Sequence, residues 1–139
     1  MKTITPYLLK FAVAATFLTI VFRYFLSYGI DNKSAIIIAL SAVFYGTAMF
    51  ISGWYFGRKD GEYLPIYDVG FRFHATTYLV HNLISVLWFT FNFNSNYEKL
   101  QIIYSTALIW GILLIVHLIF YLRARKKSIN NLYKEDLFD

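Results

Sequence analysis

The chain has 139 residues, of which 58% are hydrophobic and only 15% are charged, and its formal net charge is +5. Ordinary soluble domains carry ~25% charged residues, so this composition argues against a water-soluble fold. The sequence contains no cysteine, which excludes disulfides, iron–sulfur ligation, thiol catalysis and cysteine-based zinc sites.

Four apolar stretches occupy most of the chain, and each is close to the ~20 residues that an α-helix needs to cross a bilayer. They predict an all-α fold: a polytopic integral membrane protein with a four-helix transmembrane bundle over residues 1–127 and a short cytoplasmic tail over 128–139. The connections between the first two and the last two stretches are short, which predicts antiparallel neighbouring helices. The predicted spans are residues 7–29, 35–56, 73–93 and 102–122.

If the predicted helices alternate in direction, most of the lysine and arginine residues outside them lie on one side of the membrane. The positive-inside rule assigns the side rich in lysine and arginine to the cytoplasm, so we expect both termini there, in a multi-pass protein of a bacterial inner membrane. The net charge is therefore a signal of topology, and we expect the lipid bilayer rather than nucleic acid as the surroundings. The basic residues on that side are Lys2, Lys10, Arg58, Lys59, Arg72, Arg123, Arg125, Lys126, Lys127 and Lys134.

The first predicted helix contains one costly residue, Arg23, which lies inside its outer end. A charge within a span either extends its side chain to the headgroups or finds a partner. Asp31 and Glu98 are the acidic residues on the same side of the membrane. Two alternatives follow: Arg23 reaches the outer headgroups, or it forms an outer-side ion pair with Asp31 or Glu98.

The second predicted helix carries small residues on one face. Ala35, Ala39, Ala42, Gly46 and Gly53 follow spacings of four, three, four and seven residues, which keep them on one side. Small residues let helix backbones approach closely in lipid. The pattern predicts a helix-packing seam, either within the chain or between subunits.

The segment over residues 57–72 combines charges and aromatic residues with several helix breakers. We expect it to lie non-helically in the inner interface, with Asp60, Glu62 and Asp68 as the main acidic site on the cytoplasmic face. The breakers are Gly57, Gly61, Pro65 and Gly70.

The tail over residues 128–139 is short, but several of its apolar residues could share one helical face. A helix of this length is marginal alone and needs a surface or a partner. The residues concerned are Ile129, Leu132, Tyr133 and Leu137. Together, the tail and the 57–72 loop are the predicted surfaces for a second copy of the chain or for another membrane or cytoplasmic protein.

Polar side chains form a stripe on the third predicted helix, and a histidine lies at a similar depth on the fourth. We expect His81 and His117 to face each other in the inner half of the bundle, with His74 nearer the surface. The candidate polar site is His74, Tyr78, His81, Asn82, Ser85 and His117.

Three interpretations of this polar site stay open. The side chains could hydrogen-bond between helices as structural groups. They could instead titrate in a proton or ion pathway, because histidine changes charge near neutral pH. In the third interpretation, His81 and His117 would bind haem or a metal. No metal ligand set, cofactor or catalytic residue is predicted, since no nucleophile–base–acid set is present.

Two motifs in the second half of the chain resemble the bacterial two-transmembrane domain family. The first is Phe71-x-x-His74-x-x-x-Tyr78-x-x-x-Asn82, and the second is Trp110-Gly111-x-x-Leu114-x-x-His117. The resemblance covers residues 71–125. His81 stands where the family usually has an apolar residue, and Leu113 replaces a second glycine. The resemblance implies a membrane module that is sometimes fused to signalling domains.

The sequence therefore predicts a small, non-enzymatic inner-membrane protein that acts as an oligomerising or partner-binding signalling or effector module. One alternative is an ion- or proton-conducting pore or a small transporter that uses His74, His81 and His117. A second alternative is a histidine-liganded haem or metal protein of the membrane.

Overall fold

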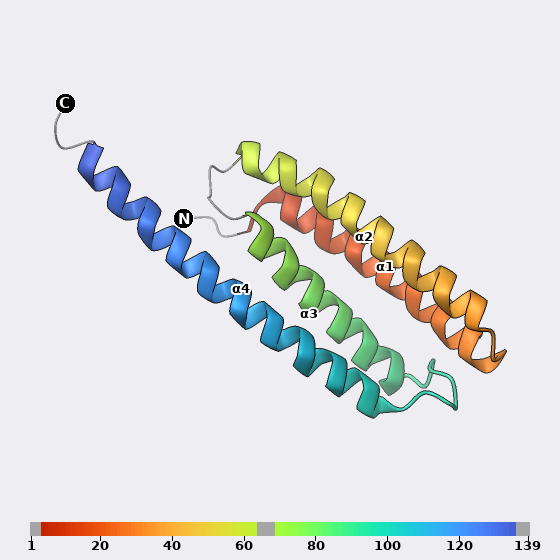
Figure 1. Cartoon of the computed structure of the whole chain (residues 1–139). Helices are drawn as coiled ribbons and strands as arrows, with labels where there is room; N and C mark the ends of the chain where they lie inside the picture. Colours follow the sequence, from red (N-terminus) through yellow and green to blue (C-terminus); the bar gives the residue numbers. More distant parts are fainter. Residues whose placement is uncertain (1–3, 64–68, 136–139) are drawn as a thin grey trace.

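The computed structural model describes residues 4–63 and 69–135, with side chains described over 4–62 and 70–123. These residues form four α-helices and no strand, so the predicted all-α fold class is confirmed (Figure 1). The helices are α1 (Pro6–Asp31), α2 (Ala35–Tyr63), α3 (Val69–Thr90) and α4 (Leu100–Glu135).

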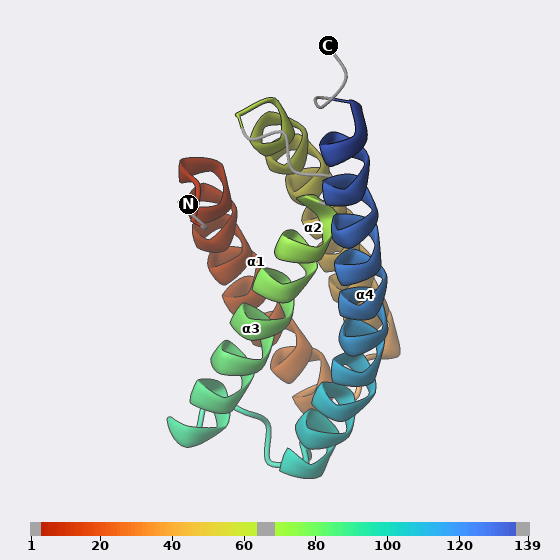
Figure 2. The same cartoon turned by 90° about the vertical axis from the view of Figure 1, so that its left-hand side faces the viewer.

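The helices pack as a three-helix core with a fourth helix on one side. α1 lies beside α2 and α3, while α4 packs against α3 and, within the described residues, against no other helix (Figures 1 and 2). The predicted neighbours, the first helix with the second and the third with the fourth, are confirmed. We call the end with connections 32–34 and 91–99 the hairpin end, and the end where α1 begins the terminal end.

Three of the described helices are long and apolar enough to cross a membrane, so the chain is a membrane protein with transmembrane helices. These segments are Pro6–Asp31, Ala35–Glu62 and Leu100–Arg123, and the most apolar 18-residue window in each has a mean hydropathy of 1.7, 2.0 and 2.3 respectively. The 22-residue helix α3 is long enough but is not among them. Its histidines and Asn82 lower its hydropathy, so α3 does not qualify as a span on composition alone.

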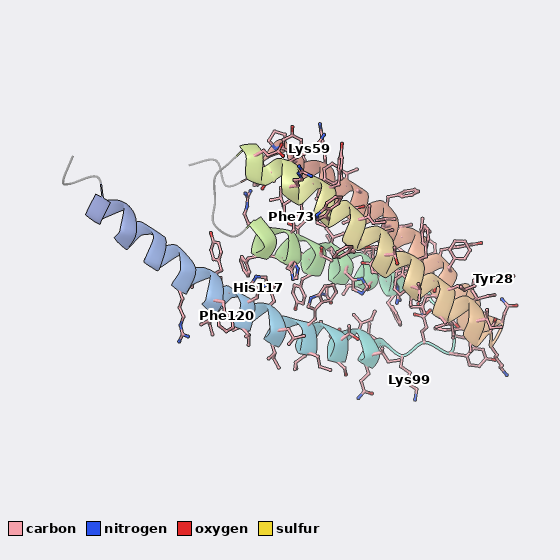
Figure 3. All side chains as sticks on the ribbon, turned by 45° about the horizontal axis from the view of Figure 1, so that its top comes forward. Tyr28, Lys59, Phe73, Lys99, His117 and Phe120 are labelled. Atoms are coloured by element: carbon pink, nitrogen blue, oxygen red, sulfur yellow. The ribbon has the colours of Figure 1, made fainter. Side chains whose placement is uncertain are left out.

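The distribution of side chains is inverted relative to a soluble bundle. Large apolar residues face outward along all four helices (Figure 3), whereas the apolar core is small and is centred on Phe11, Ala15 and Phe73. Lipid is the solvent that accommodates such a surface, because polar groups in a membrane must turn inward to find partners. The buried polar residues are Thr5, Thr19, Arg23, Ser27, Ser41, Asp60, Ser85 and Ser95.

The α1–α2 hairpin depends on a close approach of the two backbones. A Cβ atom on Gly29 would lie 2.9 Å from Ile38 Cγ1 and 3.2 Å from the Ile38 backbone nitrogen. Only glycine fits there without displacing the second helix. At the other end of α1, Thr5 is the N-cap: its hydroxyl accepts from the Leu8 backbone N–H at 3.2 Å, and Pro6 opens the helix.

The prediction of a non-helical 57–72 segment is wrong over most of its length. α2 continues through Gly57 and Gly61 to Tyr63, and α3 already begins at Val69. A glycine inside a helix costs only ~1 kcal/mol, which tertiary contacts of this turn offset. Residues 64–68, with Pro65 and Asp68, lie outside the described residues.

The fourth helix is longer than its apolar stretch. α4 continues past the predicted end at residue 122 to Glu135, so much of the predicted 128–139 tail is helical in backbone. The side chains of the predicted tail face, residues 129–137, lie outside the described residues.

Candidate functional site

One face of α1 supplies much of the polar interior. Phe11, Ala15, Thr19, Arg23 and Ser27 follow each other at four-residue spacing, and all five are buried. This spacing keeps side chains on one side of a helix. The first two belong to the apolar core, and the other three carry polar groups towards the hairpin end.

Arg23 is buried and paired rather than extended to the headgroups. Its Nη2 lies 2.9 Å from Glu98 Oε2, and both side chains are only 6% exposed. Glu98 belongs to the 91–99 connection, so this ion pair joins α1 to the α3–α4 hairpin. The Arg23 guanidinium also lies over the Phe89 ring, 5.4 Å from its centroid.

Glu98 collects further hydrogen bonds at the hairpin end. Its Oε1 accepts from the Ser27 hydroxyl at 2.5 Å and from the Ser95 backbone N–H at 3.2 Å. Trp88 of α3 donates from Nε1 to the Ser27 hydroxyl at 3.1 Å. Asp31, the other predicted partner of Arg23, instead accepts a hydrogen bond from the Ser95 hydroxyl. The three acidic and basic residues predicted for this side therefore lie in one region, but the ion pair joins Arg23 to Glu98.

A second polar chain crosses the middle of the bundle. The Thr19 hydroxyl donates to the Ala15 carbonyl at 2.7 Å and lies 3.1 Å from the Tyr45 hydroxyl, which lies 3.1 Å from His81 Nδ1. The His81 ring also contacts Trp110, with ring centroids 5.5 Å apart. Side chains of all four helices thus meet around His81.

A third polar cluster lies at the terminal end of the bundle. Asp60 is fully buried, and its carboxylate accepts from the Thr5 hydroxyl and from Arg72 Nη1, the latter at 3.1 Å. It joins the start of α1, the last turns of α2 and the start of α3. Asp60 therefore does not share an acidic surface with Glu62 as predicted, because α2 stays helical here and turns the Asp60 side chain inward while that of Glu62 is 67% exposed.

The histidines of α3 and α4 pair differently from the prediction. His117 faces His74, with ring centroids 5.1 Å apart and the rings at 81° to each other. His81 lies seven residues further along α3, or ~10 Å, so the predicted pairing of His81 with His117 is wrong. α3 begins at Val69, four residues before the predicted start at residue 73, so His74 rather than His81 lies level with His117.

Of the remaining predicted polar residues, Tyr78 and Asn82 form hydrogen bonds, whereas Ser85 does not in the part of the chain that the structure describes. The Tyr78 hydroxyl donates to the Ala107 carbonyl at 3.1 Å, and Asn82 Nδ2 donates to the Tyr78 carbonyl at 2.7 Å. Ser85 is buried, and its hydroxyl has no hydrogen-bond partner among the described residues. The histidine pair required for haem is not brought together. Within the described residues, no group of three or more histidine, aspartate or glutamate side chains could hold a metal.

The small-residue stripe of α2 faces away from the other helices over most of its length. Ala35, Ala39, Ala42 and Gly46 are exposed, and a Cβ atom on Gly46 would meet nothing within 4 Å. Gly53 differs, because a Cβ atom there would lie 3.8 Å from Phe11 Cε2. The prediction that the first four residues pack against another helix of the same chain is therefore wrong. Packing of these residues against a helix of another chain remains a prediction.

Several site residues escaped the sequence analysis. The signal that could have identified two of them is the four-residue spacing that Thr19 and Ser27 share with Arg23. Their partners on other elements carry no comparable signal. The residues missed as members of these clusters are Thr5, Thr19, Ser27, Tyr45, Trp88 and Ser95.

Comparison of the chain with family models, with curated proteins and with solved structures finds no match in any of the three. The resemblance of residues 71–125 to the two-transmembrane domain family therefore stays a prediction.

Proposed function

We propose that this chain is a four-span protein of a bacterial inner membrane that acts without catalysis, as a module that oligomerises or binds a protein partner. In this proposal α3 also crosses the membrane, in addition to α1, α2 and α4. Its polar side chains can lie within the membrane because they are turned towards the other three helices. Both chain ends then lie on one side, and the excess of basic residues there assigns that side to the cytoplasm.

The observation that carries this proposal is the outward face of α2. Helices in lipid associate by close packing, since lipid chains are as apolar as the helices themselves. Ala35, Ala39, Ala42 and Gly46 leave a strip without large side chains, and among the described residues no other helix packs on it. A transmembrane helix of a second copy or of a partner would approach closely along it.

The polar interior supports a rigid module better than a pore. Arg23 is paired with Glu98, Tyr45 is bonded to both Thr19 and His81, and Asp60 is bonded to Thr5 and Arg72. Hydrogen bonds and ion pairs between side chains of different elements hold helices together. A path for ions would need polar groups that remain open to water. Signalling would then pass through α4, which continues past the apolar span to Glu135.

Replacing Gly46 with leucine tests the proposal. We expect the purified chain to be an oligomer in mild detergent, and Gly46→Leu to weaken its association about tenfold or more, because the added side chain prevents close approach. Native mass spectrometry over a range of protein concentrations measures both. Thr47→Leu is the matched control, since it adds similar bulk at the next exposed position but on a different face of α2. A monomeric parent chain that captures no partner, or an oligomer that Gly46→Leu leaves unchanged, would contradict the proposal.

A further inference from the structure

A groove of about 670 Å³ opens on the bundle in its terminal half. It lies between α2 and α3, and Trp110 of α4 completes its lining. Small-molecule sites in proteins have volumes of ~300–1,000 Å³, so this groove is large enough for a ligand.

Glycines line the groove on both of its sides. Gly53 and Gly57 of α2 and Gly70 of α3 line it. A Cβ atom on Gly53 would make only an ordinary contact, 3.8 Å from the Phe11 ring. Since α4 packs on α3 and not on α2 within the described residues, it leaves the groove open to the surrounding lipid.

The floor and walls of the groove are mainly apolar. Phe11 and Phe73 are buried beneath it, with ring centroids 4.8 Å apart, and Met49 and Trp54 contribute from α2. An apolar hollow that faces lipid is stabilised when a chain of methylene groups fills it, because its lining atoms otherwise lack contacts. An acyl chain of the membrane is the occupant that this surface suits.

A basic residue lies at the terminal end of the groove. The Arg58 side chain lines it and is 70% exposed, and its Nε lies 3.6 Å from Glu62 Oε1, whose side chain is 67% exposed. Exposed ion pairs of this kind contribute little, so Arg58 is available to a stronger anion. Arginine binds phosphate oxygens through several N–H groups at once.

From this geometry we propose that the groove binds an anionic phospholipid of the membrane. One acyl chain lies between α2 and α3 over Phe11 and Phe73, and the phosphate is bound by Arg58. The test of this proposal can be separated from that of the oligomeric state: Gly46 is on the same side of α2 as Gly53 but lies two turns, or ~10 Å, away and is not among the described residues that line the groove.

Tryptophan quenching tests the lipid site. Two of the three tryptophans, Trp54 and Trp110, line the groove, while Trp88 is bonded to Ser27 near the hairpin end. The full chain is placed in phosphatidylcholine vesicles that contain the same small fraction of either dibrominated phosphatidylglycerol or dibrominated phosphatidylcholine. We expect the anionic lipid to quench about fivefold more effectively, the preference that one basic residue near an anionic surface supplies.

Three variants decide what causes this preference. Gly53→Leu fills the groove and Arg58→Gln removes the exposed charge, so each should reduce the ratio of anionic to zwitterionic quenching to about one. Gly46→Leu should leave the ratio unchanged even if it dissociates the oligomer. Equal quenching by both lipids in the parent chain would overturn the proposal. A preference that disappears in Arg58→Gln but persists in a folded Gly53→Leu variant would also overturn it, because charge alone would then explain the binding.

Discussion

Replacing Glu98 with alanine is expected to lower the free energy of unfolding by about 3–5 kcal/mol, because it leaves the buried Arg23 guanidinium without its carboxylate. Arg23 and Glu98 are each 6% exposed, and the same carboxylate also accepts from Ser27 and from the Ser95 backbone. The loss should be measured in detergent micelles by titration with a denaturing detergent, with helix content followed by circular dichroism.

A double variant separates the ion pair from the hydrogen bonds around it. Arg23→Met combined with Glu98→Gln removes both charges while keeping side chains of similar length, so it should be more stable than Glu98→Ala alone. A Glu98→Ala variant that stays within about 1 kcal/mol of the parent chain would show that the pair is not a buried ion pair in the membrane.

Replacing Asp60 with alanine is the second change with a large expected effect, a loss of about 3 kcal/mol. Asp60 is fully buried, and the Thr5 hydroxyl and the Arg72 guanidinium both bond to its carboxylate. Its removal takes away the group that joins the ends of α1, α2 and α3. The same unfolding titration measures the loss.

Glu62→Ala is the matched control for Asp60→Ala. Glu62 lies two residues further along α2, but its side chain is 67% exposed and its ion pair with Arg58 is loose. We expect this variant to change the free energy of unfolding by less than ~1 kcal/mol. Equal losses in the two variants would mean that burial of Asp60 does not determine its contribution.

Hydropathy predicts the large features of this fold well, because they depend on the length of the apolar stretches. The existence and order of four helices and the two antiparallel hairpins follow from segment and loop lengths alone. The ends of the helices do not, because they depend on contacts. α2 passes through Gly57 and Gly61 where Asp60 is anchored by Thr5 and Arg72, and no local signal contains that information.

The sequence predicts several of the residues that form the candidate site, but it does not predict which of them contact one another. The sequence identifies Arg23 as a residue that needs a partner, and Glu98 as one of two candidates. It does not supply the register between α3 and α4, which decides that His117 faces His74, or the register between α2 and α3, which decides that His81 bonds to Tyr45. Register depends on how side chains such as Tyr78 and Trp110 pack across the helices, a property of both helices together.

The arrangement as a whole depends on α3 crossing the membrane despite its polar side chains. The chain has no cysteine, so single cysteines introduced at Lys59 and Lys99 provide clean reporters on either side of α3 (Figure 3). In sealed vesicles of known orientation, a membrane-impermeant maleimide should label these two positions from opposite sides, with Lys33→Cys labelled on the side of Lys99→Cys. Labelling of Lys59→Cys and Lys99→Cys from the same side would contradict a four-span bundle.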